Sequence, residues 1–110
     1  VAELKRTWAE WFESYDILLC PVTPSAALPH DHTDFVERTM TIDGVERSYY
    51  DNTSWPGLIG VVELPSAVPP VGLTDEGLPV GIQIVAPYLR DRDAIQVARL
   101  IGTYTPPPGF

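Results

Sequence analysis

Cysteine, lysine and long apolar runs are scarce in this chain of 110 residues. The single cysteine, Cys20, excludes an internal disulfide framework. We therefore expect a reducing, cytoplasmic compartment, although any signal peptide upstream of Val1 would be hidden. No apolar stretch approaches the roughly 20 residues that a membrane-spanning helix needs. Basic residues number 7 against 15 acidic ones, giving a net charge of −8, which argues against nucleic acid and anionic membranes as partners.

Proline, in contrast, is abundant. Its 12 copies indicate several turns and loops and argue against an all-helical fold. A hydrophobic content of 45% suffices for a modest core in one domain and excludes a disordered tail. The composition therefore predicts an α/β protein with many short connections.

The segment from Leu64 to Pro87, LPSAVPPVGLTDEGLPVGIQIVAP, predicts two buried strands around a short turn rich in Gly, Asp and Glu. Its near-continuous apolar run, 80–86, is typical of a strand covered on both faces. A third short strand, 16–20, is expected to end at the prolines that follow it. We expect 16–20, 67–71 and 79–86 to share one mixed sheet, with a helix over 91–101 packed on it.

Two amphipathic helices flank these strands. In the first, which we expect to pack its aromatic face into the core, apolar residues recur at helical spacing at Leu4, Trp8, Trp11, Phe12 and Tyr15. An interface to a missing domain is the alternative, and because the chain starts inside this helix we expect it to be truncated. The last helix should begin with Asp91 as N-cap and end before Gly102, with a tail from Pro106 to Pro108. Its apolar stripe is Ala94, Val97, Ala98 and Ile101, widened by Ile95 and Leu100.

The middle of the chain carries turn signals. Asp43-Gly44 is the dipeptide favoured in two-residue hairpins, so a hairpin is expected over 39–50. A short helix over 55–59 should follow, with Pro56 in its first turn and Asp51 or Asn52 as its cap. The loop before the hairpin contains the one cluster that could suggest a metal site, His30, Asp31, His32 and Asp34. Zinc needs three or four convergent ligands and no second Cys or His cluster exists, so we expect no metal and a solvated loop with Asp-capped turns.

Several ordered motifs resemble the amidase signature family. GLPVGIQIVAP, preceded by PVGLTDEG, is similar to the C-terminal end of these enzymes. Upstream, YDILLCPVTPSAALPHD resembles the family's Tyr-Asp-x-Leu-Leu-x-Pro-x-Thr-Pro segment, and DNTSWPGLIGVVELPSAVPPVGLT resembles the helix and strand that follow it. The resemblance runs from Trp8 to Gly102.

The resemblance implies a serine hydrolase of amide bonds, with a catalytic serine, a second serine on a cis peptide and a lysine. In the family those residues lie in the N-terminal and middle parts, in a lysine-containing segment and a Gly/Ser-rich tract. This chain has neither, because Lys5 lies on the polar side of the first expected helix and no lysine or histidine is near any of the serines, Ser14, Ser25, Ser48, Ser54 and Ser66. We therefore expect residues 1–110 to be the C-terminal part of an amidase domain, a fragment of that fold with mixed β-sheet strands flanked by helices and no catalytic residue of its own.

The expected function follows from the same resemblance: hydrolysis of a small carboxylic amide to acid and ammonia or amine, without a cofactor. The family's helix before the Gly-Leu-Pro-like strand borders the acyl side of the cleft, and the matching positions give the pocket candidates Tyr49, Tyr50, Trp55, Leu58 and Ile59. Trp55 and Leu58 fit core packing equally well. Glu63 stands where the family commonly has a small or apolar residue, so the pocket is expected to depart from the family's geometry.

Two other functions stay open. The chain could be an autonomous non-catalytic module that binds a partner through its Trp-rich helix or its sheet edge. Within the family it could instead belong to the amidase component of a glutamyl-tRNA amidotransferase, which would require partner subunits. A homodimer is also left open. An upstream lysine segment and a Gly/Ser-rich tract would decide for an amidase over the module.

Overall fold

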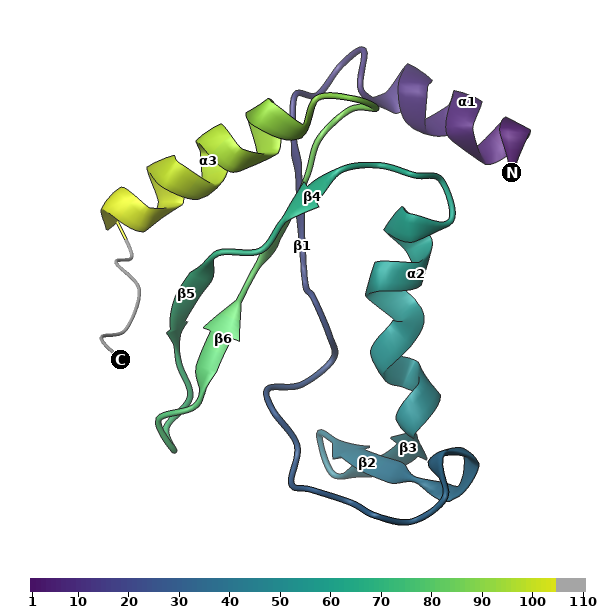
Figure 1. Ribbon diagram of the computed structural model, residues 1–110, viewed down its shortest axis with the longest axis vertical. Helices are drawn as coiled ribbons and strands as arrows, with labels where there is room; N and C mark the ends of the chain where they lie inside the picture. Colours follow the sequence, from purple (N-terminus) through teal and green to yellow (C-terminus); the bar gives the residue numbers. More distant parts are fainter. Residues whose placement is uncertain (105–110) are drawn as a thin grey trace.

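The computed structural model describes residues 1–104 (Figure 1). The helices are α1 (Ala2–Trp11), α2 (Ser54–Gly60) and α3 (Asp91–Tyr104), with two 3-10 turns, η1 (Phe35–Glu37) and η2 (Tyr49–Thr53). The strands are β1 (Leu18–Cys20), β2 (Thr39–Ile42), β3 (Val45–Ser48), β4 (Ser66–Ala67), β5 (Pro70–Leu73), β6 (Pro79–Gly81) and β7 (Gln83–Val85). The α/β class is as predicted. The expected proline tail, Pro106 to Pro108, lies outside the described residues.

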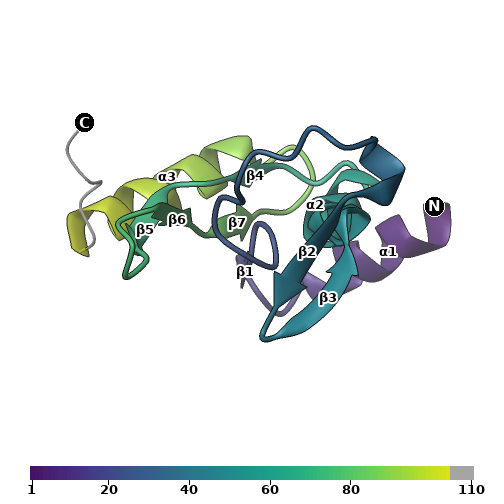
Figure 2. The same cartoon turned by 90° about the horizontal axis from the view of Figure 1, so that it is seen from below.

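The centre of the fold is a three-stranded sheet of order β1-β7-β4. Along β7 the side chains alternate between two faces, as in any strand. Ile84 packs with Ala86 and with Ala94 of α3, whereas Val85 packs with Cys20 and with Ile59 of α2. Seen from below, the sheet lies between α3 on one side and α2 on the other (Figure 2). Because both faces of β7 are covered, Ile84 and Val85 are completely buried, and each contributes about 1.5–3 kcal/mol of hydrophobic stabilisation.

The expectation of one mixed sheet is wrong in two respects. Every strand pairing within residues 1–104 is antiparallel, and the strands form three separate sheets. The run 79–86 divides at Ile82 into β6 and β7, and the other predicted strand, 67–71, divides at Pro69. Pro69 has no backbone N–H to continue a ladder, and its carbonyl oxygen accepts a hydrogen bond from the Ile82 N–H at 3.2 Å. That contact marks the place where the chain leaves the central sheet and forms the β5-β6 ribbon.

The last helix covers the sheet as predicted, but its extent differs. Ala94 is buried, and the partly buried Val97, Ala98 and Ile101 pack on the same cluster. The predicted widening of this stripe is wrong, because Ile95 is 55% and Leu100 53% exposed. Helix α3 begins at Asp91 and continues to Tyr104, so Gly102 lies inside it. No helix within residues 1–104 has the length and apolar character of a membrane span.

The hairpin and the short helix are confirmed. Asp43 and Gly44, with φ of 51° and 79°, connect β2 to β3, which is the backbone that a type I′ turn requires. Pro56 lies in the first turn of α2. The predicted cap is wrong, since Asp51 belongs to η2 and the hydroxyl of Ser48 instead accepts a hydrogen bond from the Tyr50 N–H. The turn η2 thus leads directly into α2 and places the hairpin at the end of α2 remote from α1 (Figure 1).

The aromatic face of α1 is only partly in the core. Trp8 and Phe12 pack against the cluster of Cys20, Ile59 and Val85, as the sequence predicted. Leu4 and Tyr15 are 49% and 56% exposed. The α1 surface therefore divides into a packed side and an exposed apolar side.

Candidate functional site

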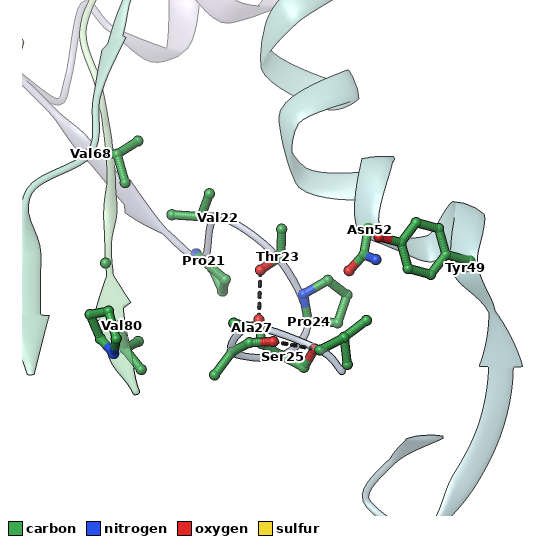
Figure 3. Close-up of a pocket in the computed structure, with 14 residues that line it drawn as sticks. Pro21, Val22, Thr23, Pro24, Ser25, Ala27, Tyr49, Asn52, Val68 and Val80 are labelled. Carbon is green, nitrogen blue, oxygen red and sulfur yellow. Dashed lines mark hydrogen bonds between the residues drawn. The ribbon is translucent and has the colours of Figure 1, made fainter. Parts of the chain in front are cut away.

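A cavity of about 650 Å³ opens beside the central sheet. Its walls come from three parts of the chain: residues 21–28, which follow β1; Tyr49 and Asn52 of η2; and Val68 with residues 79–81 of β6. Figure 3 shows the first segment between Val68 and Val80 on one side and Asn52 and Tyr49 on the other. The cavity thus joins segments that are far apart in the sequence.

Residues 21–28 form a tight bend because two prolines and two hydroxyls shape it. Pro21 ends β1, since the strand cannot continue through a residue without an N–H. The Thr23 hydroxyl donates to the Ser25 carbonyl oxygen at 2.7 Å, and the Ser25 hydroxyl donates to the Ala26 carbonyl oxygen at 3.0 Å (Figure 3). The bend presents neutral apolar and hydroxyl groups to the cavity.

Tyr49 is fixed from behind by an aromatic cluster. Its ring lies 5.4 Å from that of Phe35 in an edge-to-face arrangement, and the Arg38 guanidinium lies 5.8 Å from the Tyr49 centroid. Arg38 is itself held, because its Nε donates to the Thr33 carbonyl oxygen at 2.8 Å. Such pairs each contribute about 0.5–1.5 kcal/mol, so Tyr49 forms a well-supported part of the wall.

The structure brings one of the five predicted pocket residues, Tyr49, onto this cavity. Trp55 and Ile59 pack on the opposite side, in the cluster with Cys20 and Val85. Tyr50 and Leu58 are 49% and 45% exposed, and Tyr50 contacts Phe35 edge to face. Sequence reasoning missed the bend 21–28, although its Pro-Val-Thr-Pro pattern was a signal. It also missed Val68 and Val80, for which no local signal exists.

A second cavity, of about 500 Å³, lies between α1 and the chain that follows α2. Lys5, Phe12 and Leu64 are among the residues that line it. The Lys5 ammonium forms an ion pair with the Glu63 carboxylate. Glu63 has a φ of 59°, the left-handed conformation that commonly ends a helix, and the Leu64 N–H accordingly returns to the Ile59 carbonyl oxygen at 3.3 Å. The departure from the family pattern at Glu63 therefore links α2 to α1.

The loop with His30 and Asp31 behaves as a capped turn. Asp31 Oδ1 accepts hydrogen bonds from the Thr33 hydroxyl at 2.7 Å and from the Thr33 N–H at 3.0 Å. These two bonds, the hydroxyl first, lower the pKa of the Asp31 carboxyl. No group of three or more metal-ligating side chains occurs in the part of the chain that the structure describes.

Comparison with known proteins gives the family. The amidase family model matches residues 1–95. The chain is 33% identical over 96 residues to an indoleacetamide hydrolase of Bradyrhizobium japonicum, covering 87% of this chain and 19% of that protein. It is also 35% identical over 95 residues to the fatty-acid amide hydrolase 2-A of Danio rerio, covering 86% and 15%. A third relative is the amidase-family component of the glutamyl-tRNA(Gln) amidotransferase of Acaryochloris marina, 32% identical over 95 residues, covering 86% and 18%.

The motifs and the cavity thus belong to an amide-hydrolysing class of protein. The chain is a member of the amidase family. It spans between 15% and 19% of the length of these three curated relatives.

Proposed function

We propose that residues 1–110 are the C-terminal part of an amidase domain that hydrolyses a carboxylic amide to the acid and ammonia or an amine. This part contributes sheet core and one wall of the acyl pocket. The observation that carries the proposal is the 650 Å³ cavity, because its walls are built from two of the family-like motifs, the bend 21–28 and the Gly-Leu-Pro-Val-Gly stretch ending at Gly81.

The lining of the cavity favours a neutral acyl group. Aliphatic and proline side chains, among them Val22, Leu28 and Val80, form most of the wall, and the polar groups are the hydroxyls and amide of Thr23, Ser25, Tyr49 and Asn52. Binding sites of this composition take apolar ligands and orient them with a few polar contacts. A zwitterionic amino-acid amide such as glutamine would need charged partners to offset its desolvation. We therefore favour an aryl or aliphatic amide over an amidotransferase that works on glutamine.

The nucleophile is expected from elsewhere in the enzyme. A serine becomes nucleophilic when a base contacts its hydroxyl, and its reaction needs N–H groups aimed at the oxyanion. The Ser25 hydroxyl in the cavity instead donates to the neighbouring carbonyl of Ala26, and the Lys5 ammonium is paired with Glu63. Residues 1–110 alone should therefore show no amide hydrolysis.

A chimera tests the proposal. The segment of the Bradyrhizobium japonicum indoleacetamide hydrolase that aligns with this chain is replaced by residues 1–95, and hydrolysis is measured on indoleacetamide, aliphatic amides and glutamine. We expect activity on the neutral amides, at least about tenfold above that on glutamine, and none from the host without the segment or from the 110 residues alone.

Two results would contradict the proposal. One is a chimera that is monodisperse, unfolds cooperatively and hydrolyses no amide. The other is turnover by the 110-residue chain alone. Sequencing the gene upstream of Val1 gives an independent check, because the proposal requires a lysine segment and a Gly/Ser-rich tract there.

A further inference from the structure

One buried polar side chain stands out in the central sheet. Gln83 is 4% exposed and lies on β7, the middle strand. It faces the same side as Val85, whose neighbours Cys20 and Ile59 are apolar. Burying an amide in such surroundings is unfavourable unless its donors find acceptors. An apolar residue would fill this place in the sheet at lower cost, so the amide calls for a specific explanation.

Both donors of the Gln83 amide are used at the start of the cavity wall. Nε2 donates to Cys20 Sγ at 3.3 Å and to the Pro21 carbonyl oxygen at 3.4 Å. Gln83 lies directly opposite Cys20 in the β1-β7 ladder, and β1 ends there. The side chain therefore reaches the first carbonyl beyond the strand, which has left the ladder.

This bond is the tether of the bend. Within residues 1–104, the other hydrogen bonds made by residues 21–28 are the local ones from Thr23 to Ser25 and from Ser25 to Ala26. The bond from Gln83 is the one that joins the bend to a distant part of the chain. Because 21–28 forms one wall of the cavity, the position of this wall relative to the sheet depends on Gln83.

We propose that Gln83 is a positioning residue of the acyl cavity, whose buried amide holds the start of the 21–28 bend against the central sheet. The inference rests on the proposed function only where it concerns the acyl group. The tether itself is a property of the chain and is tested without catalysis.

The first experiment measures the tether in the 110-residue chain. Gln83→Met keeps the length of the side chain and removes both donors. Hydrogen exchange followed by mass spectrometry should show protection within 22–28 reduced about fivefold or more, since a typical hydrogen bond is worth up to about a tenfold change in an equilibrium. Protection in α3 and in β4 should stay unchanged. The matched control is Gln96→Met, the same change on the exposed face of α3, which should alter neither region.

The second experiment uses the chimeric hydrolase. A displaced acyl wall should raise KM for amides with bulky acyl groups about tenfold and leave kcat within about twofold. A merely structural defect lowers the amount of active enzyme, so it reduces the apparent kcat and leaves KM unchanged. Gln83→Leu, equally apolar and without donors, should reproduce both effects.

Three results would overturn the inference: unchanged exchange within 22–28, loss of protection throughout the chain, or an unchanged KM in an active chimera. The second would show that Gln83 serves the core alone. An inactive parent chimera would count against the proposed function, and the exchange measurement would still decide for or against the tether.

Discussion

Trp55 and Tyr49 offer a direct test of which aromatic residue shapes the acyl site. Both were predicted as pocket residues, and they are close in sequence. The structure gives them different surroundings, since Tyr49 lines the 650 Å³ cavity and Trp55 packs against the buried cluster of Cys20, Ile59 and Val85. We therefore expect opposite effects from the same substitution, alanine, at the two positions.

The magnitudes follow from burial. Replacing a fully buried Trp by Ala costs about 3–5 kcal/mol, and since Trp55 is only partly buried we expect about 2–3 kcal/mol for Trp55→Ala. In a chain of this size that lowers Tm by about 10 °C or more. Tyr49→Ala loses the edge-to-face contact with Phe35, which is worth about 1 kcal/mol. It also removes part of the cavity wall and should change the ratio of kcat/KM between bulky and small amides about tenfold.

The assay combines two measurements on each variant. Urea unfolding of the 110-residue chain gives the free energy of unfolding, and the chimeric hydrolase gives kcat/KM on a bulky and a small neutral amide. Trp55→Ala should lower stability and leave the kcat/KM ratio within about twofold. If Trp55→Ala moves the ratio about tenfold while Tm is unchanged, the tryptophan lines the acyl site and our assignment of the wall is wrong.

Three further predictions concern stability and ionisation. Ile84→Ala should cost about 3–5 kcal/mol in urea unfolding because Ile84 is 0% exposed, whereas Ile95→Ala, at 55% exposure, should cost less than about 0.5 kcal/mol; similar losses would refute the description of the core. Glu63→Gly should raise the free energy of unfolding by up to about 1 kcal/mol because it removes the strain at a φ of 59°, and a loss larger than that of Glu63→Ala would contradict this. The pKa of Asp31, lowered from 3.8 by its bonds to Thr33, means that the turn's contribution is present above pH 3.8 and is lost as pH falls through the lowered pKa; an NMR titration should show this pKa rising in Thr33→Val.

Local chemistry explains which elements the sequence predicted correctly. The hairpin depended on Asp43-Gly44, and both residues have the positive φ that this turn requires. The helix α3 depended on a stripe at helical spacing, and Ala94 is buried as that stripe predicts. In both cases the deciding interaction acts within a few residues, so a short pattern carries the information.

The division of the strands could not be read in the same way. The run 79–86 is apolar and extended throughout, so nothing in its periodicity marks a break at Ile82. The break depends on Pro69, more than ten residues earlier, which accepts a hydrogen bond from Ile82 where the ladder would otherwise continue. The widened stripe on α3 failed for a related reason, because how much of a helix is covered depends on the width of the sheet beneath it, and here that sheet has three short strands.

The break in the sheet and the candidate site have a common cause at Gly81. A Cβ built there would lie 2.9 Å from Val68 Cγ1 and 3.2 Å from the Pro69 carbonyl oxygen, closer than side chains normally approach. Glycine therefore permits the β6 backbone to pass next to Val68 at the point where both strands leave the central sheet. Val68 and Gly81 line the cavity on one side, and the bend tethered by Gln83 lines it on the other. Since β6 and β7 are separated by Ile82 alone, a glycine that sets one wall and a glutamine that holds the other stand two residues apart in the family-like motif GLPVGIQIVAP, and this gives that motif a physical reason to contain both.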